Sequence, residues 1–273
     1  MKVLDLHILE VGIRVLCQDP YSYDLLARGY SAFIRPDHPT ADLNYTIIPE
    51  ENSSYQIILE GRPAETAADD YELLYMFEKS LTMEIQLLRQ DLLFMHAGAL
   101  EYEGRVCLLV APSGSGKSTT TWALLNNGFR YLSDELAPID LATLEVHIYP
   151  HALCLKAAPP EPFQLPAGVF HTSHTIHVPV EYIPAEICIQ PYPLAAVFFL
   201  RYDPSVKEPT AKPVSKAEAA ARIYSNALNL LAHERYGLDA ALKVADQSAC
   251  FELITCDLQK TCDLVKSLLE QQA

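Results

Sequence analysis

The sequence contains no cluster of basic residues. Its 273 residues include 20 lysines and arginines against 35 aspartates and glutamates, which gives a formal net charge of −15 at pH 7. Because nucleic acids and anionic membrane surfaces are bound by clustered positive charge, we expect neither of them as a partner.

Long apolar runs are also missing, although 50% of the residues are hydrophobic. No uninterrupted apolar stretch reaches the roughly 18 residues of a membrane span, and Asp5 and His7 interrupt the apolar residues at the start of the chain. We therefore expect a soluble, cytoplasmic protein with enough apolar residues for a sizeable core.

The cysteines include no C-x-x-C pair, which is the spacing of many metal and redox sites. Several of the seven lie inside apolar runs, so we expect reduced thiols in the core rather than a disulfide framework or a metal site. They are Cys17, Cys107, Cys154, Cys188, Cys250, Cys256 and Cys262.

The most informative stretch that is present reads Ala-Pro-Ser-Gly-Ser-Gly-Lys-Ser-Thr, at residues 111–119. It follows the apolar run 106–110 and precedes a helical segment, which is the setting of a phosphate-binding loop. Glycines let backbone N–H groups converge on phosphate oxygens, Lys117 adds a positive charge, and Ser118 offers a hydroxyl to Mg²⁺. Ala111 stands where the usual pattern has glycine. The alternative to a phosphate-binding loop is a glycine-rich turn that binds no ligand. We expect ATP to bind through Ser113, Gly114, Ser115, Gly116, Lys117, Ser118 and Thr119.

Two acidic residues follow the next predicted strand. The helix after the loop ends at Gly128, residues 129–132 form a strand, and Asp134 and Glu135 come directly after Ser133. In a strand–helix–strand unit both strands end at the same sheet edge, so these carboxylates should lie beside the loop. We expect Ser118, Asp134 and Glu135 to hold Mg²⁺, directly or through water; the alternative is a solvated turn.

A second candidate lies before the loop. Residues 92–102 and 105–110 are apolar runs separated by Glu103-Gly104, a hairpin signal. If Tyr102 faces Arg105, the ladder brings His96 opposite Ala111, beside the entrance of the loop. The alternative is a histidine satisfied within the core.

The chain divides into two predicted domains. Residues 1–68 alternate short apolar runs with turn signals and predict a small α+β module, either a structural lid or a recognition element. Residues 69–273 predict an α/β domain around the phosphate loop. An amphipathic helix over 71–90 should bridge the two parts.

A proline-rich stretch at 159–193 contains eight prolines and predicts a mobile loop over the site. His171, His174 and His177 lie there at three-residue steps, which leaves a metal site as an alternative. Arg201, at the end of an apolar strand over 195–200, is either a phosphate contact or an ordinary charge at a strand end.

Together these motifs resemble the catalytic domain of the HPr kinase/phosphorylase family and the related kinases that modify lasso-peptide precursors. The resemblance rests on His96-Ala97-Gly98, then residues 113–118, then 132–135, in this order and spacing, and is strongest over 92–140. It implies the mixed sheet shared with phosphoenolpyruvate carboxykinases, with Asp134 as the base on a serine hydroxyl and His96 as a catalytic residue. Glu135 stands where the bifunctional enzymes have a second aspartate, and their Glu-Ile-Arg-Gly signature is absent.

The sequence therefore predicts an Mg-ATP-dependent kinase that phosphorylates a Ser or Thr hydroxyl of a peptide or protein. Lys117 would neutralise charge on the phosphoryl oxygens, and Asp134 would accept the hydroxyl proton. Two alternatives stay open: a kinase of a small hydroxylated metabolite, and a nucleotide-dependent switch or ATPase without a phosphoacceptor. The sequence also leaves open whether the chain forms a homo-oligomer.

Overall fold

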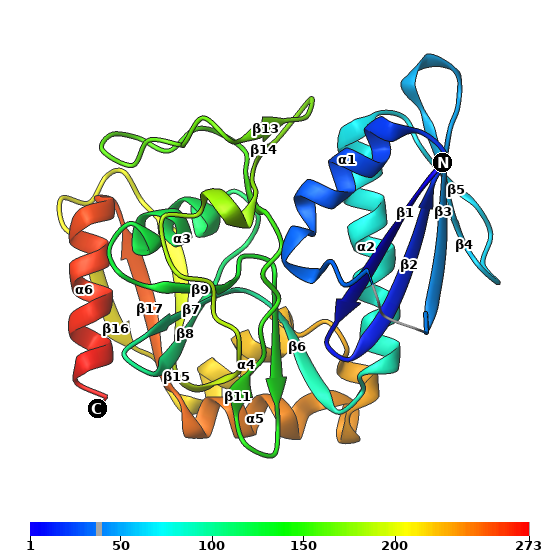
Figure 1. The fold of residues 1–273 in the computed structure, drawn as a ribbon. Helices are drawn as coiled ribbons and strands as arrows, with labels where there is room; N and C mark the ends of the chain where they lie inside the picture. Colours follow the sequence, from blue (N-terminus) through cyan, green and yellow to red (C-terminus); the bar gives the residue numbers. More distant parts are fainter. Residues whose placement is uncertain (37–39, 273) are drawn as a thin grey trace. The chain divides into compact units, whose positions relative to one another are not determined.

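The computed structural model describes residues 1–36 and 40–272, and the chain forms two compact units (Figure 1). The first unit comprises Met1–Arg89, His151–Ala158 and Leu165–Tyr182. The second comprises Gln90–Pro150, Pro159–Gln164 and Ile183–Ala273. Each unit combines sheets and helices, so the fold is a mixed α/β fold as the sequence predicts.

The first unit is built on a five-stranded sheet in the order β1-β2-β3-β4-β5. Only β2 and β3 are parallel; the other neighbours are antiparallel. Alternate side chains of β1, β3 and β4 are buried, as expected for a sheet with one covered face. The strands are β1 (Lys2–Ile8), β2 (Val11–Cys17), β3 (Leu43–Pro49), β4 (Tyr55–Leu59) and β5 (Glu65–Ala67).

Helices α1 (Pro20–Gly29) and α2 (Asp70–Leu88) contact this sheet and each other. Aspartates cap both helices: Asp19 accepts from the Ser22 N–H and Asp69 from the Glu72 N–H. The apolar positions of α2 recur at three- and four-residue steps and are buried, which confirms the amphipathic helix predicted there. They are Leu73, Leu74, Phe77, Leu81 and Ile85.

Because α2 packs on β4 and β5, it belongs to the first unit. The division therefore differs from the predicted boundary between residues 68 and 69. Two later segments also return to the first unit, where they form a sheet in the order β12-β14-β13. Its strands are β12 (Leu153–Leu155), β13 (Phe170–His171) and β14 (Ile176–Val178). The first unit also contains the 3-10 turns η1 (Ser31–Phe33), η2 (Glu51–Ser53) and η3 (Val180–Tyr182).

The proline-rich stretch is therefore not simply the predicted loop. It contributes two strands to this small sheet, and Phe163, Phe170 and Val178 are buried. Apolar side chains spaced between the prolines supply this packing, and the sequence pattern did not reveal their partners.

The second unit is built on nine strands, seven of them in the order β6-β10-β11-β15-β8-β7-β9, with β17 beside β15 and β16 beside β17. Its strands are β6 (Leu92–His96), β7 (Gly98–Tyr102), β8 (Arg105–Val110), β9 (Arg130–Ser133), β10 (Leu136–Asp140), β11 (Glu145–Val146), β15 (Tyr192–Tyr202), β16 (Thr210–Pro213) and β17 (Ala249–Thr255).

Four helices cover this sheet as two contacting pairs, α3 with α6 and α4 with α5 (Figure 1). They are α3 (Lys117–Leu125), α4 (Lys216–Asn226), α5 (Leu238–Gln247) and α6 (Leu258–Glu270), with 3-10 turns η4 (Leu230–Ala232) and η5 (Glu234–Gly237) between α4 and α5. Across the described residues, no helix is both long and apolar enough to cross a membrane.

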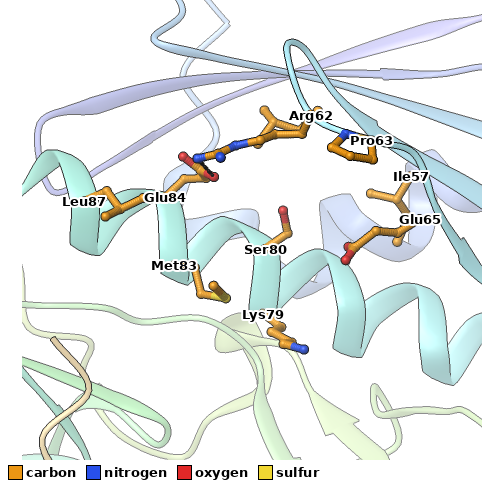
Figure 2. A pocket seen from close by; sticks show the side chains of 10 residues that line it. Ile57, Arg62, Pro63, Glu65, Lys79, Ser80, Met83, Glu84 and Leu87 are labelled. Atoms are coloured by element: carbon orange, nitrogen blue, oxygen red, sulfur yellow. Dashed lines mark ion pairs between the residues drawn. The ribbon is translucent and has the colours of Figure 1, made fainter.

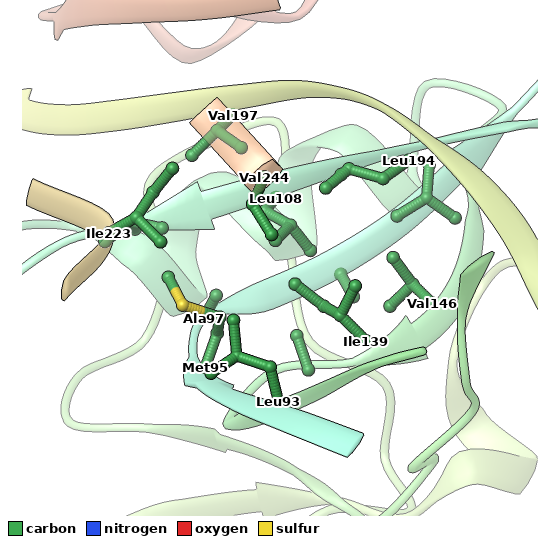
Figure 3. Close-up of a cluster of buried hydrophobic side chains, with 14 of the residues drawn as sticks. Leu93, Met95, Ala97, Leu108, Ile139, Val146, Leu194, Val197, Ile223 and Val244 are labelled. Carbon is green, nitrogen blue, oxygen red and sulfur yellow. The ribbon is translucent and has the colours of Figure 1, made fainter. Parts of the chain in front are cut away.

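The core of the second unit lies where α4 and α5 cover the sheet (Figure 3). Ile223 of α4 and Val244 of α5 pack against strand residues such as Met95, Leu108 and Val197, all of which are buried. Burying each such side chain contributes on the order of 1.5–3 kcal/mol. This packing fixes the positions of the strands whose ends carry the candidate site.

Parallel strands bring several chain segments to one edge of this sheet. β7 is antiparallel to both β8 and β9, and β15 is parallel to both β8 and β17. The carboxyl ends of β8, β9, β15 and β17 therefore lie at the same edge, which is where open α/β sheets bind ligands.

Candidate functional site

A glycine-rich loop links the carboxyl end of β8 to the start of α3. Gly114 and Gly116 adopt positive φ angles of 84° and 93°, which side chains rarely tolerate. The Ser115 N–H donates to the Pro112 carbonyl at 3.2 Å and closes the turn. Ala111 is buried and has no positive φ, so alanine fits at this position without backbone strain.

The two glycines of the loop differ in the space beside their Cα atoms. A Cβ added at Gly114 would meet nothing within 4 Å, whereas one added at Gly116 would lie 3.6 Å from Tyr202 Cβ on β15. The first intrahelical hydrogen bond of α3 runs from the Thr120 N–H to the Gly116 carbonyl at 2.9 Å. The N–H groups of Ser118 and Thr119 precede it, and such N–H groups at a helix start favour an anion.

Lys117, the first residue of α3, is 7% exposed. Its Nζ donates to the backbone carbonyl of Asp134 and lies 3.1 Å from Oε2 of Glu135. The ammonium group is therefore held at the turn between β9 and β10.

Glu135 joins this lysine to a histidine. Its Oε1 lies 2.8 Å from Nε2 of His96, so each carboxylate oxygen has one partner. Burial raises the pKa of Glu135, but the hydrogen bond from His96 and the charge of Lys117 outweigh it and lower the pKa to about 2. Glu135 is consequently a carboxylate at neutral pH, and its side chain is still 44% exposed.

His96 reaches this position by a route other than the predicted one. The hairpin register is confirmed from Tyr102↔Arg105 to Gly98↔Leu109. Beyond Gly98 the ladder ends, because residues 92–96 form β6, which pairs with β10 in the register Leu136↔His96. The prediction that His96 faces Ala111 is therefore wrong, whereas its placement beside residue 135 follows from the β6–β10 pairing.

Asp134 lies on the inner side of the same turn and is 1% exposed. Its Oδ1 would be 3.7 Å from a Cβ added at Gly98, and Thr121 Oγ1 would be 2.9 Å from the same atom. The absence of a side chain at Gly98 thus makes room for the Asp134 carboxylate and the first two turns of α3.

Ser133 shapes the turn that carries both acids. Its buried Oγ accepts the N–H groups of Glu135, at 3.3 Å, and Leu136, at 3.1 Å. Serine followed by acidic residues after a strand is a signal for such a side-chain-stabilised turn, and our sequence interpretation did not use it.

Comparisons with known proteins add little to this geometry. No protein-family model and no curated protein matches the sequence. Among solved structures, one match is described as the structure of the Hpr(Ser) kinase/phosphatase from Coxiella burnetii. The two chains are 11% identical, the alignment covers 66% of this chain and 99% of that one, and the TM-score is 0.30. At such values the match does not support a functional conclusion, which has to come from the site itself.

The structure brings together most of the residues that the sequence singles out. His96, Lys117 and Glu135 are in contact, Asp134 contacts Lys117 through its carbonyl, and the other loop residues precede or begin α3. Arg201 lies on β15 of the same sheet, but its Nη1 lies 3.0 Å from Asp203 and its side chain is 57% exposed. Its role as a phosphate contact stays a prediction.

The alternative metal site at His171, His174 and His177 is not supported. His177 stacks on Phe170 with ring centroids 4.8 Å apart, and His174 packs edge-on against Tyr71 at 5.0 Å. Burial, with smaller contributions from His151 and His171, lowers the pKa of His177 to about 4. Within residues 1–36 and 40–272, no three His, Cys, Asp or Glu side chains are grouped to hold a metal ion.

Proposed function

We propose that this protein is a kinase that binds Mg-ATP at residues 113–119 and transfers the γ-phosphoryl group to a Ser or Thr hydroxyl of a peptide or protein. The observation that carries the proposal is the position of Lys117: it begins the helix after a loop with two positive-φ glycines, and its ammonium group meets the acidic turn at the same sheet edge. Positioned charge at the phosphates is the main protein contribution in phosphoryl transfer.

Lys117 must change partners for this role. Its Nζ now lies against Glu135 and the Asp134 carbonyl, and phosphate oxygens would replace Glu135 as its anionic partner. The exchange leaves Glu135 with His96 alone and frees one carboxylate oxygen.

The residues present fit a bound Mg²⁺ ion. Ser118 follows Lys117 on the first turn of α3, and the carboxylates of Asp134 and Glu135 supply the hard oxygen ligands that this ion prefers. The ion would neutralise charge on the phosphate oxygens. Both Glu135 oxygens are engaged here, so we assign the metal role of Glu135 to the state in which Lys117 has moved.

The proton of the acceptor hydroxyl needs a base, and we assign this role to Asp134. Its carboxylate lies close to Gly98 and is shielded from bulk water. We expect His96 to hold Glu135 in place through its contact with the carboxylate.

The test is to incubate the full-length protein with Mg-ATP and an oriented library of serine- and threonine-containing peptides. Phosphate addition, read by mass spectrometry, should match ATP consumed. ATP consumption without a phosphorylated product would indicate an ATPase or switch. Phosphorylation of free serine or glycerol at far higher kcat/KM than any peptide would assign a small-molecule acceptor instead.

A further inference from the structure

A cavity of about 400 Å³ lies in the first unit, between α2 and the β4–β5 hairpin (Figure 2). Five apolar side chains line it: Ile57, Leu59, Pro63, Met83 and Leu87. Two of them, Met83 and Leu87, are each 54% exposed. Exposed apolar side chains around a hollow of this size are typical of a binding surface.

The charged groups around this cavity are not all paired. Arg62 forms an ion pair with Glu84, at 2.9 Å, on one side. Glu65 lies on the other side, with Ser80 between them (Figure 2). Among the described residues, the Glu65 carboxylate has no ion pair or hydrogen bond, and neither has the Lys79 ammonium group. Lys79 would repel a cation placed over α2, so a basic group would lie at Glu65, on the strand side.

β5 is the last strand of its sheet. It pairs with β4 alone among the described residues, so its other edge carries backbone groups without a neighbouring strand. Such an edge is a template for an extended peptide. Glu65 and Thr66 are exposed on it.

The β4–β5 register shows which residues of this edge face the cavity. Glu65 pairs with Ile57, and both side chains line the cavity, so they lie on the face that α2 covers. On an added strand, the residue opposite Glu65 would point to this same face, and so would the residue two positions away.

We propose that the first unit binds an extended peptide of a partner as an added strand along β5, with a basic side chain opposite Glu65 and an apolar side chain two residues away in the cavity. Backbone hydrogen bonds to β5 supply affinity, and the cavity and Glu65 supply specificity. The excess of acidic residues, 35 against 20, favours a basic peptide by electrostatic attraction. This inference concerns binding alone and does not depend on the proposed kinase activity.

The test uses the full-length protein without nucleotide and a fluorescein-labelled peptide, TVTKTLTVT, in which lysine and leucine are two residues apart. Fluorescence anisotropy measures binding. We expect Glu65→Lys to weaken it by about fivefold or more and Met83→Asp by about tenfold. The peptide with glutamate in place of lysine should bind Glu65→Lys better than it binds the native protein. Glu51→Lys, an exposed site in the same unit, is the matched control and should leave binding unchanged.

A second measurement does not depend on any variant. Hydrogen–deuterium exchange of the native protein should slow at residues 64–68 and 76–87 when the peptide is added, and a peptide with proline in place of the central threonine should not slow it. No binding at 1 mM peptide, equal binding of the proline peptide, or an unchanged affinity of Glu65→Lys would each overturn the proposal. Saturable binding of free leucine without binding of the peptide would assign the cavity to a small molecule and overturn it as well.

Discussion

Nε2 of His96 lies 2.8 Å from Oε1 of Glu135, and the second oxygen of the same carboxylate lies 3.1 Å from Nζ of Lys117. One side chain thus joins the end of β6 to the first residue of α3, across a turn that also carries Asp134.

Glu135→Gln should lower stability at neutral pH by an amount that shrinks in acid. Burial raises the pKa of Glu135, but His96 and Lys117 outweigh it and hold the pKa at about 2, below its ordinary value of 4.5. A carboxylate with a depressed folded pKa contributes stability that is fully present above about pH 4.5 and is lost as the pH falls toward 2. Urea unfolding of both proteins at pH 7 and near pH 2.5 measures the difference. A difference that does not change with pH would contradict the pairing.

Lys117→Met should keep the fold and reduce phosphoryl transfer by about 10² or more, because it removes the charge at the phosphates while filling the same buried space. Circular dichroism checks the fold, and ATP turnover gives the effect. Lys207→Met, at an exposed site of the same unit, is the control. Near-normal turnover of a folded Lys117→Met protein would mean that the loop is not the catalytic site.

Asp134→Asn and Glu135→Gln should have different effects on the reaction. Loss of the base in Asp134→Asn should leave nucleotide affinity within a few-fold and cut transfer by roughly 10² or more. Glu135→Gln should raise the Mg²⁺ concentration needed for half-maximal rate, and should raise it more than Asp134→Asn does. Mg²⁺ titrations of both variants decide this, and indistinguishable titrations would reject the division of roles.

His96→Gln should lower turnover without unfolding the protein, because the more flexible amide can still donate to Glu135 but holds the carboxylate less firmly than the imidazole ring does. The measurement is kcat together with the thermal midpoint. His7→Gln, in the first unit, serves as the control for a partly exposed histidine near a carboxylate. An unchanged kcat would show that His96 contributes to the structure but not to turnover.

Gly98→Ala should destabilise the protein by about 1–3 kcal/mol and disturb the site, since the new methyl group would lie 2.9 Å from Thr121 Oγ1. Adding Thr121→Ala should recover part of the loss, which a double-mutant cycle of unfolding free energies would show. Gly29→Ala, where an added Cβ meets nothing within 4 Å, is the matched control. If Gly98→Ala left the free energy of unfolding unchanged, the residues around Gly98 and Asp134 would have shifted to accommodate the methyl group.

Local patterns made much of the fold predictable. The apolar steps of α2, the Glu103-Gly104 hairpin and the strand–loop–helix around Lys117 all depend on neighbours within a few residues of one another. The strands β13 and β14 escaped prediction because they are only two and three residues long, too short for an alternating pattern to show.

The sequence by itself determined the candidate loop, the order of the motifs and the acidic turn, because backbone conformation at glycines and the chirality of a strand–helix–strand unit are local constraints. Only the tertiary structure decided that β6 leaves the line of β7 to pair with β10 and so sets His96 beside Glu135. It also decided that α2 and residues 165–182 belong to the first unit. These outcomes depend on which distant apolar faces bury one another, and no short stretch of sequence encodes that choice.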